Sequence, residues 1–80
     1  MIIIAQNGQC AVNYNNCCII RRNGCYIHAY MNDGSDIAMG VYTSEERCGE
    51  VYSALINALS NANSDTRISL NGDKVTLPEK

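Results

Sequence analysis

Hydrophobic residues in the first 42 positions come in short runs that turn-forming dipeptides separate. Asparagine-glycine and aspartate-glycine pairs supply the positive φ angles that tight turns require, and they stand at Asn7-Gly8, Asn23-Gly24, Asp33-Gly34 and Asn71-Gly72. The runs between them predict strands at residues 1–6, 9–13, 17–22, 25–31 and 36–42. Because parallel strands need long crossovers and these connections are short, we expect one antiparallel meander.

After residue 42 the hydrophobic period lengthens from two residues to about 3.6, which predicts an amphipathic helix over residues 43–61. Its expected apolar stripe contains Cys48, Val51, Tyr52, Leu55, Ile56 and Leu59. Thr43 and Glu46 have the spacing of a capping box, and acidic Glu45 and Glu46 suit the positive end of the helix dipole. We expect Gly49 to let the helix approach a neighbouring backbone closely.

A second hairpin is predicted over residues 66–77, and its apolar set is Ile68, Leu70, Val75 and Leu77. A lone hairpin is barely stable in water, so we expect this one to dock on the sheet or on another copy of the chain. The sequence thus predicts one domain (1–80) of the α+β class. A five-stranded antiparallel meander (1–42) packs on one amphipathic helix (43–61), and a C-terminal hairpin (66–77) follows.

The expected strand register sorts the sheet side chains onto two faces. A two-residue loop at Asn23-Gly24 places Ile20 opposite Ile27, and a three-residue loop at 32–34 places Met39 opposite Ile27. The helix is then expected to cover Cys18, Ile20, Ile27, Ala29, Ile37, Met39 and Val41. A loop of even length would instead move the aliphatic residues of the fifth strand to the other face.

The uncovered face is the candidate site, and it is expected to carry Ile19, Arg21, Tyr26, His28, Tyr30 and, near its edge, Tyr42, with Cys17 on the same side. Tyrosines are favoured at interfaces because they combine large area with a hydrogen-bonding tip. The face could associate with another copy or be covered by the C-terminal hairpin. Alternatively, it could be a ligand platform, on which Arg21 and His28 meet anionic oxygens.

Size and charge narrow the range of partners. An 80-residue chain buries only about 60% of the surface that it exposes when unfolded, so we expect a homodimer or higher oligomer. The net charge is −2 with six Lys and Arg residues, which disfavours binding to duplex nucleic acid or single-stranded RNA. The first apolar run is too short for a membrane span or a signal peptide, so we expect a soluble, cytoplasmic protein without a membrane partner.

Candidate chemistry is sparse. The five cysteines lack a C-x2-C pair, the usual mark of a structural zinc site, and a reducing compartment would keep them as thiols. His28 is the only histidine. Cys17 could lie diagonal to it, but no oxyanion donors are evident. No phosphate-binding glycine motif occurs. We therefore expect no enzyme, no catalytic residues, no cofactor and no metal.

Three segments carry a resemblance to known proteins: "MIIIAQNG" at the start, "NDG" before the fifth strand, and "MGVYTSEERCGEV" at the helix start. Together they resemble a group of small, mostly uncharacterised proteins of Gram-positive bacteria and their phages and prophages. The resemblance implies a phage protein that acts by occupying a host protein or a signalling molecule used in defence. Combined with the tyrosine face, it suggests a homo-oligomer that sequesters a small anionic ligand such as a signalling nucleotide. The alternative is an inhibitor or assembly module that binds a host or phage protein.

Overall fold

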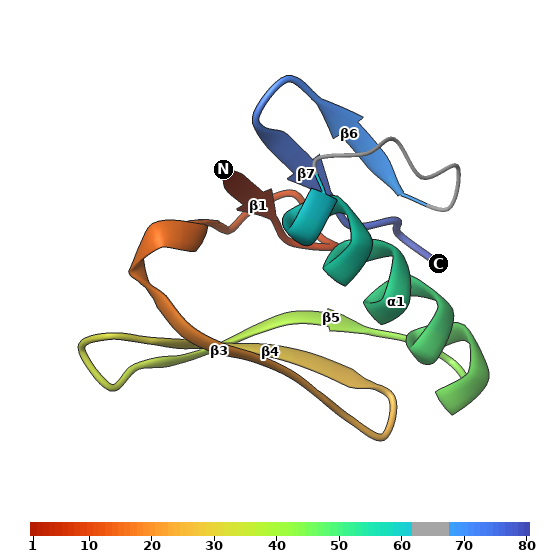
Figure 1. The fold of residues 1–80 in the computed structure, drawn as a ribbon. Coiled ribbons are helices and arrows are strands. Elements are labelled where there is room, and N and C mark those ends of the chain that lie inside the picture. Colours follow the sequence, from red (N-terminus) through yellow and green to blue (C-terminus); the bar gives the residue numbers. More distant parts are fainter. Residues whose placement is uncertain (62–67) are drawn as a thin grey trace.

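A computed structural model describes residues 1–61 and 68–80, and Figure 1 shows its strands around one long helix. The N-terminal half contains β1 (Ile2–Ile4), β2 (Ala11–Asn13), the 3-10 turn η1 (Tyr14–Asn16), β3 (Cys17–Asn23), β4 (Tyr26–Met31) and β5 (Asp36–Val41). The helix α1 (Glu45–Asn61) follows, and then β6 (Ser69–Asn71) and β7 (Lys74–Thr76). The predicted α+β class is confirmed.

The strands form two sheets instead of one five-stranded meander. β3, β4 and β5 make an antiparallel three-stranded sheet, while β1 belongs to a second sheet of order β2-β1-β7-β6. The predicted single meander is wrong at the connection between β2 and β3. There the Asn13 side chain accepts a hydrogen bond from the Asn15 backbone N–H and starts the η1 turn. This local bond competes with strand pairing.

The C-terminal hairpin docks on the first strand of the chain. β7 pairs in parallel with β1, with Ile3 opposite Val75, while β6 pairs antiparallel with β7. The hairpin therefore does not cover the tyrosine face, which was one of the sequence-based alternatives. Residues 66 and 67 of the predicted hairpin lie outside the described residues.

The core lies around α1, which packs between the two sheets (Figure 1). The buried helix positions are Cys48, Val51, Ala54, Leu55 and Ala58. The apolar stripe is thus rotated from the prediction, because Tyr52, Ile56 and Leu59 are only partly buried while two alanines are fully enclosed. Residues buried with them are Ile27, Ala29 and Met39 from one sheet, and Ile3, Val12, Val75 and Leu77 from the other sheet and the segment after it.

The helix start and Gly49 differ from the prediction. The Ser44 hydroxyl accepts a hydrogen bond from the Arg47 backbone N–H at 3.1 Å, so Ser44 caps the helix and the proposed Thr43 capping box is wrong. Glu45 and Glu46 occupy the first turn as predicted. Apart from its chain neighbours and the backbone of its own helix, no atom lies within 4 Å of the position that a Cβ on Gly49 would take. The expected close helix approach at Gly49 is therefore also wrong.

The register between β3 and β4 is shifted by two residues from the prediction. Ile20 lies opposite Ala29 instead of Ile27, because the two-residue loop is at Gly24-Cys25 instead of Asn23-Gly24. A shift of two keeps every side chain on its expected face, since side chains alternate with a period of two. The three-residue loop at 32–34 is confirmed by the bond from the Met31 N–H to the Ser35 carbonyl, and Gly34 has φ +91°.

Two β-bulges reverse the predicted faces at the strand ends. The irregularity between Cys17 and Ile19 leaves Cys17 packed against the core and Cys18 exposed, the opposite of the prediction. In β5 an extra residue, Met39, places Gly40 opposite Ile27. The residues beyond the bulge then change sides, because one inserted residue inverts the alternation.

Gln6 joins the two sheets at the outer edge of β5. Its backbone N–H donates to the Met39 carbonyl at 2.8 Å, and its side-chain oxygen accepts from the Val41 N–H at 2.8 Å. Its side-chain Nε2 donates to the carbonyls of Val41 and Glu79 at 2.8 and 2.7 Å. The carboxamide therefore occupies the position of a neighbouring strand. It bonds the Val41 N–H and carbonyl, which would otherwise be unpaired at the edge of the sheet.

Candidate functional site

The face of the three-stranded sheet that points away from α1 carries five of the six predicted site residues. We call this the outer face, and it consists of Ile19, Arg21, Asn23, Tyr26, His28, Tyr30, Asp36, Ala38 and Val41. Ile19 and Tyr26 are each 48% exposed and Val41 is 46% exposed. Large apolar side chains are thus left open to solvent on one face of the sheet.

The central strand of the outer face holds three rings in a row. The ring centroids of Tyr26 and His28 are 5.9 Å apart, those of His28 and Tyr30 are 6.2 Å apart, and both pairs are tilted by about 30°. His28 Nδ1 lies 3.0 Å from Asp36 Oδ1. That contact fixes the imidazole between the two tyrosines, and it occupies one oxygen of the Asp36 carboxylate.

Arg21 lies directly across the strand pair from His28. Its side chain is exposed, and no ion pair of Arg21 is found within residues 1–61 and 68–80. The outer face therefore combines one unpaired guanidinium with one carboxylate that already has a partner. A guanidinium with five N–H donors and no partner is suited to bind anionic oxygens.

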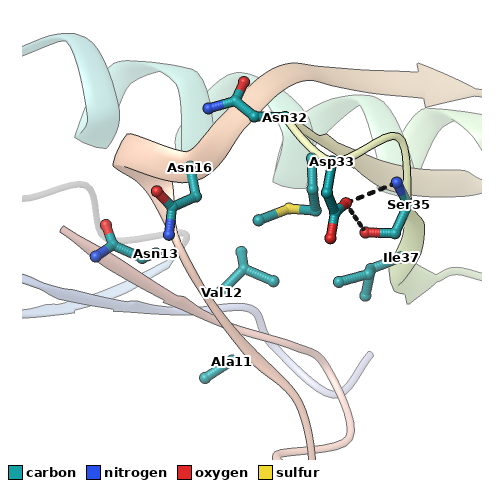
Figure 2. A pocket seen from close by; sticks show the side chains of 9 residues that line it. Ala11, Val12, Asn13, Asn16, Asn32, Asp33, Ser35 and Ile37 are labelled. Atoms are coloured by element: carbon teal, nitrogen blue, oxygen red, sulfur yellow. Dashed lines mark hydrogen bonds between the residues drawn. The ribbon is translucent and has the colours of Figure 1, made fainter.

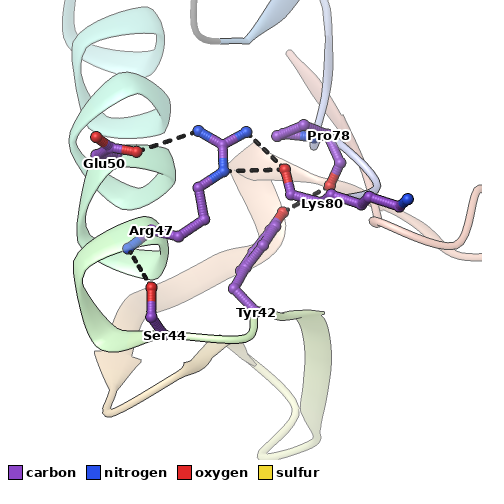
Figure 3. A network of polar contacts seen from close by, with 6 residues as sticks. All are labelled: Tyr42, Ser44, Arg47, Glu50, Pro78 and Lys80. Carbon is purple, nitrogen blue, oxygen red and sulfur yellow. Dashed lines mark hydrogen bonds and ion pairs between the residues drawn. The ribbon is translucent and has the colours of Figure 1, made fainter.

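Tyr42, the sixth predicted site residue, does not lie on the outer face. It is only 4% exposed, and its hydroxyl donates a hydrogen bond to the Pro78 carbonyl at 2.8 Å (Figure 3). The bulge at Met39 explains the error, because it turns Val41 outward and Tyr42 inward. Burial raises the pKa of Tyr42 to about 12; the Arg47 charge lowers it and Cys48 raises it by smaller amounts.

The tail beyond β7 is held in the same network. Arg47 donates from Nε and Nη2 to the Lys80 carbonyl at 2.9 and 2.6 Å, and from Nη1 to Glu50 at 3.3 Å (Figure 3). Tyr42 and Arg47 thus bind two carbonyls of residues 78–80. Their role is to fix this segment against α1 and β5.

The five cysteines lie in different environments. Cys10 and Cys18 are exposed, Cys17 and Cys25 are partly buried, and Cys48 is fully buried. Burial raises the pKa of the Cys17 and Cys48 thiols, which keeps them protonated. The bulge turns Cys17 away from the face that carries His28. Within the described ranges, no group of three His, Cys, Asp or Glu side chains could hold a metal ion.

A hollow lies between β2, the η1 turn and the β4–β5 loop, and sequence reasoning missed it (Figure 2). We call it the polar groove; its volume is about 520 Å³, and its lining residues are Ala11, Val12, Asn13, Asn16, Met31, Asn32, Asp33, Ser35 and Ile37. The signal in the sequence was the pair of asparagine-rich turns at 13–16 and 32–35. Only the fold shows that these two turns lie together.

One carboxylate in the polar groove is fixed by its own loop. Asp33 Oδ1 accepts hydrogen bonds from the Ser35 backbone N–H at 2.9 Å and from the Ser35 hydroxyl at 2.5 Å. These bonds lower the pKa of Asp33, so the group is ionised at neutral pH. It is the only formally charged side chain among the groove residues.

The helix of the described chain is not long and apolar enough to cross a lipid bilayer. Comparisons of the whole chain with protein-family models, with curated proteins and with solved structures found no match.

Proposed function

We propose that this chain is a non-enzymatic, homo-oligomeric binding protein that associates through its outer face and sequesters a small anionic ligand, such as a signalling nucleotide. The observation that carries the proposal is the exposure of Ile19, Tyr26 and Val41 on the same face as Arg21, which has no ion-pair partner among the described residues. An apolar patch rimmed by polar groups is typical of an interaction site on a small protein.

Self-association is favoured by the charges of the outer face. The face carries one basic residue, Arg21, and one acidic residue, Asp36, on opposite outer strands. A two-fold axis brings the same surface of two copies together, so Arg21 of one copy can face Asp36 of the other. Such a face is complementary to itself, and its rings and aliphatic side chains provide the area that would be buried.

A small anionic ligand suits the same surface for a different reason, and a pocket between two copies can hold it where an Arg21 is left without an Asp36 partner. The tyrosine rings offer flat faces for stacking, and the Arg21 guanidinium offers donors for phosphate oxygens. Because the whole chain has a net charge of −2, a compact ligand is favoured over a long nucleic-acid backbone. The resemblance to phage and prophage proteins supports a counter-defence role for this sequestration.

The assembly part is tested by light scattering on the wild-type protein and two tyrosine variants. We expect at least a dimer for the wild type and a monomer for Tyr26→Asp, because the new carboxylate would be buried at the interface. Tyr14→Asp is the matched control, since Tyr14 is 39% exposed but lies outside the outer face. A monomeric wild type, or dissociation by both variants alike, would contradict this proposal.

The ligand part is tested by calorimetry with cyclic and ADP-ribose-type nucleotides. Arg21→Gln should abolish binding, whereas Arg22→Gln should retain it. Arg22 lies on the opposite side of β3 and donates to the Gly24 carbonyl at 3.0 Å. If no nucleotide in the panel binds the wild type, the ligand part fails while the assembly part stands.

A protein partner is the second candidate for the outer face. Tyrosine and arginine are among the residue types that most often dominate binding energy at protein interfaces. Tyr26 and Arg21 lie diagonally across the β3–β4 pair, because Arg21 is opposite His28 and Tyr26 is opposite Asn23. In this case the chain would inhibit a host protein or serve as an assembly module. A single stoichiometric partner that is captured by the wild type and lost with Tyr26→Asp would favour this alternative over nucleotide binding.

A further inference from the structure

The polar groove is separate from the outer face and has a different chemistry. Figure 2 shows Asn13 and Asn16 on one side of the hollow and Asp33 and Ser35 on the other, with Val12 between them. The two surfaces share no residue, so an inference about the groove does not depend on the proposed function. Its volume of about 520 Å³ is within the range of small-molecule sites.

The charge of the groove indicates which ligands it can accept. Among the described residues no lysine, arginine or histidine lines it, and Asp33 supplies a single negative charge. The two bonds from Ser35 to Oδ1 fix the orientation of the carboxylate, and no other residue in 1–61 and 68–80 bonds to Oδ2. Such a site repels anions and attracts a cation that carries N–H donors.

The rest of the groove suits the body of a small organic molecule. Val12 is 6% exposed, and Met31 and Ile37 are partly buried and pack against the core. These three side chains form an apolar floor. The Asn16 side chain makes no hydrogen bond to another described residue, and its amide can accept from or donate to a ligand.

We propose that the polar groove binds a small primary amine, with the ammonium group on the free oxygen of Asp33 and a hydrocarbon body on Val12, Met31 and Ile37. The groove is open to solvent, so the ion pair contributes modestly, by a factor of about two to five in affinity. The apolar floor and the amides supply the remaining contacts.

The test is a nuclear magnetic resonance titration with benzylamine, and with benzyl alcohol and benzoate as matched probes of the same shape. We expect benzylamine to bind about two- to fivefold more tightly than benzyl alcohol and benzoate to bind most weakly. The amide signals that move should belong to residues 11–16 and 31–37. Equal binding of the three probes, no binding, or signals that move only on the outer face would overturn the proposal.

A variant isolates the carboxylate. Asp33→Asn keeps the oxygen that accepts from the Ser35 N–H, so the loop geometry is retained, and it should remove the preference for benzylamine over benzyl alcohol. Asp73→Asn makes the same change of charge at an exposed turn position outside both the groove and the outer face, and it should keep the preference. If Asp33→Asn does not fold, the wild-type protein still tests the ion pair. About 0.5 M salt should abolish its preference for benzylamine over benzyl alcohol. A preference that survives salt, or survives in Asp33→Asn, would contradict the ion pair.

Discussion

Replacing Gly40 by alanine tests the packing that the β5 bulge creates. A Cβ on Gly40 would lie 2.9 Å from Tyr42 Cε2, 3.3 Å from its hydroxyl oxygen and 3.4 Å from Cζ. The ring cannot move away freely, because it is 4% exposed and its hydroxyl is bonded to the Pro78 carbonyl. Overpacking of this kind costs about 1–3 kcal/mol. Alanine also lowers the conformational entropy of the unfolded chain, which stabilises the folded state by about 0.4–1 kcal/mol.

We therefore expect Gly40→Ala to lower the free energy of unfolding by about 1–2 kcal/mol. For a chain of this size, each kcal/mol of lost stability lowers Tm by about 4–8 °C. Gly49→Ala is the matched control: it has open space around it and should stabilise the helix by about 1 kcal/mol. Urea unfolding followed by circular dichroism measures both changes.

A second variant identifies the cause of the loss. In a Tyr42→Leu background the shorter side chain removes the ring that Gly40 contacts, so the cost of Gly40→Ala should largely vanish. If Gly40→Ala is as stable as the wild type, or if its cost is the same in the Tyr42→Leu background, the described contact between Gly40 and the Tyr42 ring does not determine stability.

Three further predictions concern buried or bridging groups. The pKa of Tyr42 is about 12 in the folded protein, whereas the ordinary value for tyrosine is 10.0. The stability that neutral Tyr42 contributes to the fold is therefore complete below pH 10 and is lost as the pH rises towards 12. Because phenylalanine cannot ionise, Tyr42→Phe should lose less stability than the wild type as the pH rises from 10 to 12, as urea unfolding would measure. Gln6→Ala should lower the free energy of unfolding by about 0.5–1.5 kcal/mol, because it removes the exposed hydrogen bonds to Val41 and Glu79. Gln6→Glu should also lose stability, because a carboxylate cannot donate to the two carbonyls. A thiol reagent should modify exposed Cys10 and Cys18 rapidly and Cys48 only on unfolding, as mass spectrometry of the labelled protein would show.

The turn residues and the change of hydrophobic period were sufficient to locate the strands and the helix. Asn-Gly and Asp-Gly pairs mark chain reversals through their own backbone preferences, which need no tertiary contact. From Ile19 onward, the faces of β3 and β4 also followed from alternation alone, since a register error of two residues leaves Tyr26, His28 and Tyr30 on the same side. For that reason most of the outer face was accessible from the sequence.

The rest depended on contacts between distant segments. β1 and β7 are three residues each, too short for their pairing to be deduced from pattern. A bulge is one residue without a distinctive sequence signal, yet the one at Met39 exchanges Val41 and Tyr42 between solvent and core. The polar groove forms because the η1 turn and the β4–β5 loop lie together, and the hydrophobic periodicity of the sequence does not predict that contact.

The parallel pairing of β1 with β7 has a consequence for the order of folding. During synthesis β1 and β2 leave the ribosome long before β7, and until then they form only a two-stranded ribbon, which is marginal in water. The β3–β4–β5 unit and α1 can collapse earlier, because their contacts are nearer in sequence. We expect the four-stranded sheet to assemble last, when Lys74–Thr76 reaches the backbone of Ile2–Ile4.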